Sequence, residues 1–542
     1  MAGLAAVARA AVDDLLAADP IRATALGDHR FDDRLPDFSD AGAADLLIRV
    51  EDHVTALDGL DDLAMRIDER ADLEILRGRL AALRFDVAEV RRRHWDPTLW
   101  DVADGISLLL ARDFAPAHER LESVIGRLRE IPRFLAEARS TLREMSAIHV
   151  ESAIAGLGGF AHVLEEAGAL AGGSDDGSDR FPAAAEAALV EVERHGAWLA
   201  ERLPGSRWDP RLGVRLYSGA LWHNLDEEMA PVQVLEAAER HLDHVGESLR
   251  DAAAQFLGDS PRSPDVVRRA LARLAAESPV THASVLSVVR AALRRTTEFT
   301  RDGDLVTIPD LEVQVVETPA ARRGAAVVHC DAPGPLETAP AGIRLVVAPT
   351  PAGGPPLSSA YHEVCLHDLT VREAMPGHAL QLSHARVSAP RSRVRHFGSS
   401  AVFARGWAAY AQQLMADRGY APDDRPDAVL RLRLQQWTIQ ARRALDAILD
   451  ARVHGGDIDE PEALALLVRR GFLNQSEANR TWRRALLAAT RLPTSFVGWR
   501  AVNGLSEDLR VLHPEWGDRQ VHDLVLSHGT LGPRHLRALL GL

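Results

Sequence analysis

The sequence predicts a mainly α-helical protein with a small β-rich insert near residues 305–350. Three observations support this fold class. Apolar residues recur every three or four positions through most of the first 300 residues and again after residue 358. Between 303 and 350 the pattern changes to short runs of β-branched residues separated by Pro and Gly. No repeat with a period of about 20–50 residues is present, which argues against a solenoid.

Residues 1–300 are expected to form a helical N-terminal half. In 118–148, apolar side chains recur at helical spacing and would line one face of a helix. The first 16 residues also predict an amphipathic helix, because Arg9 and Asp13 interrupt an apolar stretch that would otherwise resemble a signal peptide. The other helical patterns in this half cover 41–60, 72–92, 181–203, 231–257 and 264–296.

Residues 301–357 are expected to form the β-rich insert. Three of its runs are rich in residues that favour strands, and turn residues separate them. The Gly-Gly-Pro-Pro sequence at 353–356 indicates a turn, since it lacks the Lys and the strand-to-helix setting of a phosphate-binding loop. The strand-like runs are 313–316, 326–328 and 343–347. Elsewhere, breaks in the helical pattern are predicted at Asp19-Pro20, 172–179 and Ser260-Pro261.

Residues 358–542 are expected to form a helical C-terminal half that carries the site. A helix over 361–372 leads into Pro376-Gly377, and the pattern over about 427–453 predicts a long helix. The remaining helical patterns cover 378–388, 399–418, 461–471, 475–490, 496–511 and a pair near 517–540.

The composition is that of a soluble globular protein, with 46% hydrophobic and 26% charged residues among 542. The net charge is −15 and both signs are interspersed, so no basic stripe is available for nucleic acid. No run of about 18 uncharged apolar residues is present, and no membrane partner is expected. Two cysteines, Cys330 and Cys365, form no disulfide framework in a chain of this length. We expect a cytoplasmic protein; no oligomeric state follows from the sequence.

Four motifs in the C-terminal half are candidates for a common site. Positions 372 and 378 are roughly 240° apart on a regular helix. They can face one another only if Pro376-Gly377 breaks that helix, through a missing N–H and a permissive backbone. Asp450 and His454 are four residues apart and share a helix face. The four motifs span 370–381, 402–412, 443–454 and 521–529.

Together these motifs resemble the bacterial "domain of unknown function 885" family, whose members look like zinc metallopeptidases. The family patterns are His-Glu-x-x-Pro-Gly-His, Glu-Gly-Trp-Ala-x-Tyr-Ala-Glu and an Asp-x-Gly-x-His ending, and the matching segments occur here in the same order. The stretches Gly27-Asp28-His29 and Leu35-Pro36-Asp37 also fit, so the resemblance covers most of the chain. It implies a large helical gluzincin-like peptidase fold around a deep central cleft, with 372–378 and 405–412 facing each other across it.

The chain departs from this pattern at the metal ligands that the resemblance implies. Arg372 stands where the family has its first His, and Arg405 stands where it has Glu. Arginine stays protonated and cannot bind Zn²⁺, so we expect no metal and no cofactor. Gln412 replaces a further Glu, and Trp499 ends a segment that in the family ends in Ser-Tyr.

Four residues are candidates for acid–base catalysis. By the resemblance, Glu373 stands at the general-base position, and His378 is its candidate partner. Asp450 and His454 form a second candidate pair. Structural roles are open for each, because Glu373 can form an ion pair with Arg372 and the other three can be buried, hydrogen-bonded side chains.

Four further residues are expected to bind substrate. Arg372 and Arg405 would place two permanent cations where the family has its metal, which favours an anionic group such as a carboxylate or phosphate. Tyr410 and Trp499 complete this set, although Trp407 and other tryptophans are expected in the core. Ligand binding that is unchanged in Arg372→Ala and Arg405→Ala variants would contradict the anion site.

Three functions remain open at this point. The first is a repurposed, metal-independent hydrolase, lyase or cyclase that acts on a small amino-acid-like or peptide-like anion, in a specialised metabolic role. The second is a pseudo-peptidase that binds a peptide or protein partner without chemistry. The third is a zinc peptidase with a rearranged site, using His378 or the pair His362 and His367, which point about 140° apart on a regular helix.

Overall fold

The computed structural model describes residues 3–171, 180–225, 229–310, 312–318, 326–337, 342–349, 361–388 and 392–542. These residues form a mainly α-helical fold with one small mixed sheet, as the sequence predicts. The loop expected at 172–179 and the turn expected at 353–356 lie outside them.

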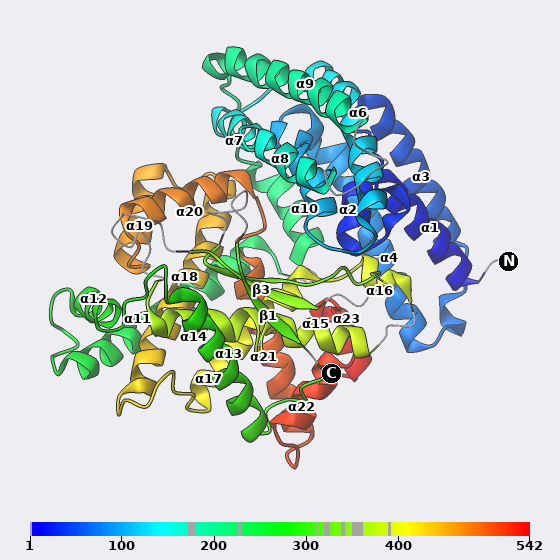
Figure 1. The fold of residues 1–542 in the computed structure, drawn as a ribbon. Helices are drawn as coiled ribbons and strands as arrows, with labels where there is room; N and C mark the ends of the chain where they lie inside the picture. Colours follow the sequence, from blue (N-terminus) through cyan, green and yellow to red (C-terminus); the bar gives the residue numbers. More distant parts are fainter. Residues whose placement is uncertain are drawn as a thin grey trace. The chain divides into compact units, whose positions relative to one another are not determined.

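The chain divides into two compact units, whose helices are coloured along the sequence in Figure 1. The boundary between the units falls after Leu212, whereas the sequence pattern suggested a helical half that extends to residue 300. The first unit comprises Met1–Leu212, Pro333–Ala341 and Arg391–Gly398; the second comprises Gly213–Ala332, Gly342–Pro390 and Ser399–Leu542.

In the first unit, the long helix α6 packs against α9 around buried aromatic residues that include Trp100 and Phe134. The pattern predicted over 118–148 is two helices, because α6 ends at Thr141 and the Ser146 hydroxyl caps α7 by accepting the His149 N–H. The helices of this unit are α1 (Leu4–Ala18), α2 (Pro20–Leu26), α3 (Asp40–Asp58), α4 (Ile67–Phe85), α5 (Ala103–Leu110), α6 (Ala117–Thr141), α7 (Ala147–Leu157), α8 (Phe160–Ala171), α9 (Arg180–Arg202) and α16 (Arg393–Phe397).

By length and composition, the helical stretch Ala147–Ala171 is apolar enough to cross a membrane, and 22% of its most apolar 18-residue segment is buried. The stretch is two helices, α7 and α8, with Gly158 and Gly159 between them. Core helices of soluble proteins have the same length and apolar composition.

In the second unit, α18 packs along α11, and α17 packs along α21. The pattern predicted over 264–296 is divided by Ser278 and Pro279 into α12 and α13. The helices of this unit are α10 (Gly213–Leu225), α11 (Pro231–Leu257), α12 (Val266–Glu277), α13 (Val285–Asp302), α14 (Glu363–Glu373), α15 (His378–Val387), α17 (Ala401–Asp417), α18 (Ala428–Gly455), α19 (Glu460–Arg470), α20 (Gln475–Leu487), α21 (Thr494–Leu512), α22 (Asp518–Leu526) and α23 (Pro533–Leu540).

The β-rich insert is confirmed as a three-stranded sheet in the order β1-β3-β2. Its strands are β1 (Val313–Glu317), β2 (Val328–Asp331) and β3 (Ile343–Val347). The central strand β3 runs parallel to β1 and antiparallel to β2. Because β2 packs against α14, the sheet lies directly beside the helix that carries the first motif.

Candidate functional site

The predicted break at Pro376-Gly377 is present and divides the first motif between two helices. Helix α14 ends at Glu373 and α15 begins at His378. At Gly377 a Cβ atom would lie 2.0 Å from the Arg372 carbonyl oxygen, so the close approach of the backbone requires glycine. The Pro376 carbonyl accepts a hydrogen bond from Trp407 Nε1 at 2.8 Å, which ties the break to α17.

Glu373 is buried at the end of α14, where it contacts the sheet. Its Oε2 accepts the backbone N–H of Cys330 on β2 at 3.1 Å. Its Oε1 lies 3.5 Å from Arg372 Nε, in the ion pair that the sequence offered as an alternative. The Arg372 side chain is 38% exposed, so this ion pair is open to solvent.

His378 is electrostatically coupled to three other predicted site residues. Burial lowers the pKa of His378 to about 4, the Glu373 carboxylate opposes this change, and the cations Arg372 and Arg405 reinforce it. The imidazole is therefore neutral near pH 7. His378 therefore lies within electrostatic range of Arg372, Glu373 and Arg405, which the sequence assigned to one site.

Arg405 projects from α17 toward the start of α21. Its Nη1 donates to the Arg491 carbonyl and to Thr494 Oγ1, both at 3.3 Å. Neither acceptor is a carboxylate. Although the Arg405 residue is exposed on α17, the neighbouring protein desolvates its guanidinium and lowers its pKa, and the cations Arg491 and Arg372 lower it further. This part of the site therefore has a surplus of positive charge.

A close crossing of α17 and α21 explains the glycine of the second motif. A Cβ atom at Gly406 would lie 2.3 Å from the backbone of Gly498, and one at Gly498 would lie 2.0 Å from the Val402 carbonyl oxygen. The next residue, Trp407, is fully buried and makes the bond to the Pro376 carbonyl. The Gly-Trp pair thus sets the distance of Arg405 from α21.

Asp450 and His454 share a face of α18, as predicted, but their partners are elsewhere in the second unit. Asp450 Oδ2 accepts hydrogen bonds from the Tyr217 hydroxyl at 2.8 Å and the Thr490 N–H at 3.0 Å. Burial raises the pKa of Asp450 to about 7. His454 Nε2 donates to the Ala485 carbonyl at 3.0 Å, and its ring stacks on Tyr217. These contacts describe a buried network that includes neither Glu373 nor His378.

Tyr410 also has its polar contact outside the Glu373 group. Its hydroxyl donates to His522 Nε2 at 2.8 Å, and Arg510 donates to the same hydroxyl at 3.2 Å. His522 Nδ1 donates to the Leu305 carbonyl at 2.7 Å, which fixes the tautomer that accepts from Tyr410. The phenol is thus held by α21 and α22.

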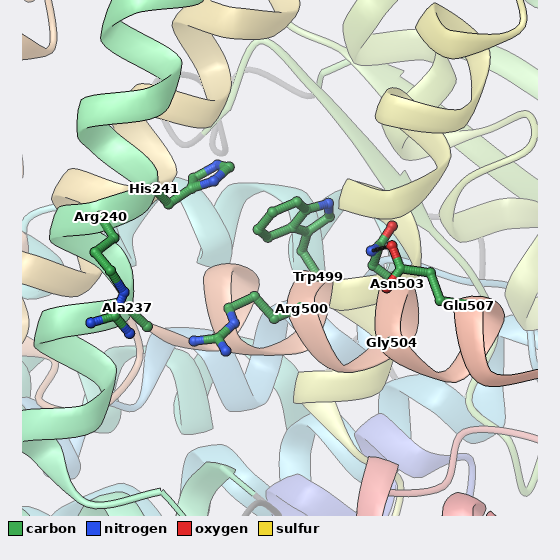
Figure 2. A pocket seen from close by; sticks show the side chains of 8 residues that line it. All are labelled: Ala237, Arg240, His241, Trp499, Arg500, Asn503, Gly504 and Glu507. Atoms are coloured by element: carbon green, nitrogen blue, oxygen red, sulfur yellow. Dashed lines mark hydrogen bonds between the residues drawn. The ribbon is translucent and has the colours of Figure 1, made fainter.

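Trp499 lines a pocket of about 360 Å³ between α11 and α21 (Figure 2). Figure 2 shows His241 on α11 and Trp499 on α21 directed toward each other; their ring centres are 4.5 Å apart. The indole Nε1 donates to Gln413 Oε1 at 2.6 Å. The other lining residues are Ala237, Arg240, Arg500, Asn503, Gly504 and Glu507.

Arg443 belongs to the site but was not assigned from the sequence. Its Nη2 donates to Gln412 Oε1 at 2.9 Å, and Gln412 Nε2 donates to Asp368 Oδ2 at 2.8 Å. Burial lowers the pKa of Arg443 to about 10, with Arg372 as the next cause. A signal was available, since Arg443 precedes Asp450 by seven residues, about two turns on the same helix face.

The described residues do not fit a zinc ion. In the parts of the chain that the structure describes, no three His, Cys, Asp or Glu side chains come together as a metal site. His362 Nδ1 accepts the Cys365 N–H at 3.3 Å, whereas His367 Nδ1 lies 2.7 Å from the Tyr420 hydroxyl. This alternative histidine pair therefore has two separate structural roles.

Residues 20–540 match the family described as "Bacterial protein of unknown function (DUF885)". A solved structure from Shewanella oneidensis, provisionally described as a lipoprotein of unknown function, has 24% identity and a TM-score of 0.84, with 100% of each chain covered. A second, from Colwellia psychrerythraea and provisionally described as a lipoprotein, has 15% identity and a TM-score of 0.82, covering 99% of this chain and 98% of that one. Metallocarboxypeptidase 1 of Trypanosoma cruzi has 11% identity over 92% of this chain and 80% of its own, and its TM-score of 0.35 is too low to support an argument. No curated protein matches this chain.

Proposed function

The chain belongs to the bacterial DUF885 family, and from that premise we propose that it is a metal-independent enzyme on a peptidase-like scaffold. Its substrate would be a small amino-acid-like or peptide-like anion, bound in a deep cleft between helices and converted by acid–base chemistry. One observation carries the proposal: Arg372 and Arg405 stand at the implied metal-ligand positions, and both act electrostatically on His378, as Glu373 does.

In this proposal, Arg372 and Arg405 bind and orient an acidic group of the substrate. Glu373 accepts a proton, and its carboxylate is already positioned by the Cys330 N–H. His378, neutral near pH 7, would donate or accept a hydrogen bond beside the reacting group without adding charge. No step passes through a metal, because the described residues offer no ligand set for one.

Asp450 and His454 remain a candidate second pair, but the proposal assigns proton transfer to Glu373 and His378. The Asp450 carboxyl group is completely buried, and its Oδ2 accepts hydrogen bonds from Tyr217 and Thr490 of the protein itself. We therefore expect this pair to support α18 against α10.

The test is turnover of N-acyl amino acids and dipeptides by the full chain, followed by mass spectrometry. Replacing Glu373 by Gln keeps the size of the side chain and removes the base, so kcat should fall by about 10² or more. The matched control is Glu363→Gln at the start of the same helix, which should leave kcat unchanged.

Three other outcomes have clear meanings. Normal turnover by Glu373→Gln would show that the catalytic assignment is wrong. Ligand binding by the wild type without any turnover would favour a pseudo-peptidase. One tightly held zinc per chain, lost together with activity on chelation, would favour a zinc peptidase with a rearranged site.

Location and biological role are also part of the proposal. We propose a cytoplasmic enzyme of specialised metabolism, whereas two solved structures of the same fold are provisionally described as lipoproteins, a class attached to the cell envelope. Cell fractionation with an antibody against the native chain separates the two locations. Biosynthetic genes beside the coding gene would support the metabolic role.

A further inference from the structure

Helices α14 and α17 run antiparallel where they carry the site, as two hydrogen bonds show. Asp368 on α14 contacts Gln412 on α17 at 2.8 Å, and Pro376, just after α14, contacts Trp407 at 2.8 Å. Residue numbers therefore increase along α14 in the direction in which they decrease along α17. These two contacts show which residues of α14 and α17 lie at the same height, or level, along the helix pair.

Three arginines occupy successive levels along this helix pair. Arg443 reaches the level of Gln412 through its hydrogen bond of 2.9 Å. Arg372 follows Asp368 by one turn, about 6 Å farther along α14. Arg405 precedes Gln412 by two turns, about 10 Å away along α17 in the same direction. Arg372 is thus the middle member of a row whose ends are Arg443 and Arg405.

The electrostatic couplings agree with this order. The charge of Arg372 lowers the pKa of Arg405 and also the pKa of Arg443. The nearby carboxylates of Asp368 and Asp446 oppose the lowering of the pKa of Arg443.

The two end members have no carboxylate partner in the hydrogen bonds that hold them. Arg405 donates to a carbonyl and a hydroxyl, and Arg443 donates to the Gln412 amide. Arg443 is 7% exposed, and its Nη1 has no hydrogen-bond partner among the described residues. The nearby carboxylate of Asp446 is instead bound to Arg484 at 2.8 Å and 2.9 Å. A buried guanidinium with an unused N–H is suited to a ligand that supplies an anionic acceptor.

We propose that Arg443 is a further substrate-binding residue, and that the site takes a ligand with two acidic groups several bonds apart. One acidic group lies against Arg405 and Arg372, and the other accepts from Arg443 Nη1. A row of cations suits an extended dicarboxylate better than a compact dianion, because a compact group cannot reach both ends. The inference rests on the proposed function for the position of the site, but its test requires no turnover.

The experiment is calorimetric titration of the full chain with glutarate, valerate and inorganic phosphate. Glutarate and valerate have five carbons each and differ by one carboxylate. Glutarate should bind at least tenfold more tightly than valerate, and more tightly than phosphate. In Arg443→Gln this advantage should fall below threefold, while the affinity for valerate stays the same. The matched control is Arg433→Gln on the same helix, which removes an ion pair to Asp417 and should leave all three affinities unchanged.

A folding defect is excluded by a second variant and by thermal melting. Arg443→Lys keeps a buried charge but loses the second N–H group, so the glutarate advantage should fall at least threefold with an unchanged melting curve. Equal affinities of the wild type for glutarate and valerate would overturn the proposal. So would tighter binding of phosphate, or a glutarate advantage that survives in both Arg443 variants.

These outcomes are separate from the test of the proposed function. The Glu373→Gln variant should still prefer glutarate, because Glu373 contributes no cation. Loss of the glutarate preference with an intact dependence of turnover on Glu373 would remove only the present inference. A glutarate preference combined with turnover that does not depend on Glu373 would remove only the catalytic assignment.

Discussion

At the scale of single residues, Arg372 and Arg405 have two electrostatic effects on the candidate site. Arg372 and Arg405 add permanent positive charge, and together with burial they hold His378 in its neutral form. Glu373 keeps its position because a backbone N–H of the sheet binds its carboxylate. The candidate site therefore combines a positioned carboxylate, a neutral imidazole and two arginines.

The Asp450 carboxyl should make the stability of the protein depend on pH. Its pKa is raised from 3.8 to about 7, so the folded state keeps this proton where the unfolded chain has lost it. The stability from Asp450 is therefore complete below pH 3.8 and is lost as the pH rises through 7. Asn cannot titrate, so Asp450→Asn should gain roughly 2–4 kcal/mol relative to wild type between pH 4 and 8.

Denaturant unfolding of both proteins across this pH range measures the difference. The exposed Asp457, which follows the same helix, provides the control, and Asp457→Asn should track the wild type at every pH. A constant difference between wild type and Asp450→Asn would show that Asp450 has no raised pKa in the folded state.

From residue spacing alone, the residues of the site were predictable only where the geometry is local, and the family resemblance placed Arg405 with them. The proximity of Arg372, Glu373 and His378 follows from a Pro-Gly break within one short segment. The partners of Asp450 and Tyr410 could not be predicted in this way. Tyr217 is 233 positions away from Asp450, and His522 is 112 positions away from Tyr410. A helix-face argument alone cannot say which side of α18 meets which neighbour.

At the scale of secondary-structure elements, the crossing of α17 and α21 depends on two glycines. Gly406→Ala would place a methyl group 2.3 Å from the Gly498 backbone, so the helices must separate. We expect a loss of about 1–3 kcal/mol of stability from overpacking. Because Arg405 bonds to the start of α21, the same shift should weaken anion binding.

Chemical denaturation and calorimetric titration with glutarate measure these two effects. Gly504→Ala is the control on α21, since its Cβ would meet no atom within 4 Å. It should stabilise the helix by about 0.5–1 kcal/mol, as a Gly→Ala change at an uncrowded position within a helix does. Equal effects of the two substitutions would contradict the close crossing.

Most helices were predictable because their apolar pattern repeats over many turns, as in α11 and α18. The errors are at short interruptions. The patterns over 118–148 and 264–296 continue across breaks at 142–146 and 278–284, because the flanking helices bury faces of similar phase. When only a few residues separate two helices, the spacing of apolar residues changes too little to reveal the break.

At the scale of the whole molecule, buried histidines should make the protein sensitive to acid. For a histidine whose pKa is lowered in the folded state, stability is complete above pH 6.5 and is lost as the pH falls toward 4. Burial lowers the pKa to about 4 for each of His195, His241, His367, His378 and His522. Five carboxyl groups with a raised pKa act in the opposite direction: Asp86, Asp101, Asp368, Asp446 and Asp450. The histidines outnumber them, because burial also lowers the pKa of His149, His223 and His396.

Scanning calorimetry should therefore give a lower Tm at pH 4.5 than at pH 7. The first unit contributes through residues such as His195 and the second through residues such as His378, so both units should be affected. A Tm that stays constant or rises on acidification would show that the carboxyl groups dominate.

The fold class and the β insert were predictable from composition and periodicity, whereas the division into two units was not. The first unit includes Pro333–Ala341 and Arg391–Gly398, two short segments that are far from residues 1–212 in sequence. Tertiary contacts determine which distant segments join a unit, and the spacing of apolar residues along the sequence carries no information about those contacts.

The hydrogen bond from Cys330 to Glu373 also gives the site a natural reporter group. Cys365 is buried, and burial raises its pKa to about 12, so its thiol is unreactive near pH 8. Cys330 is partly exposed and is the other cysteine of the chain. A thiol-directed fluorophore would thus label one position, next to the candidate base, without any engineered cysteine. Occupancy of the site by a ligand would then be visible as a change in emission or labelling rate, even before a substrate is known.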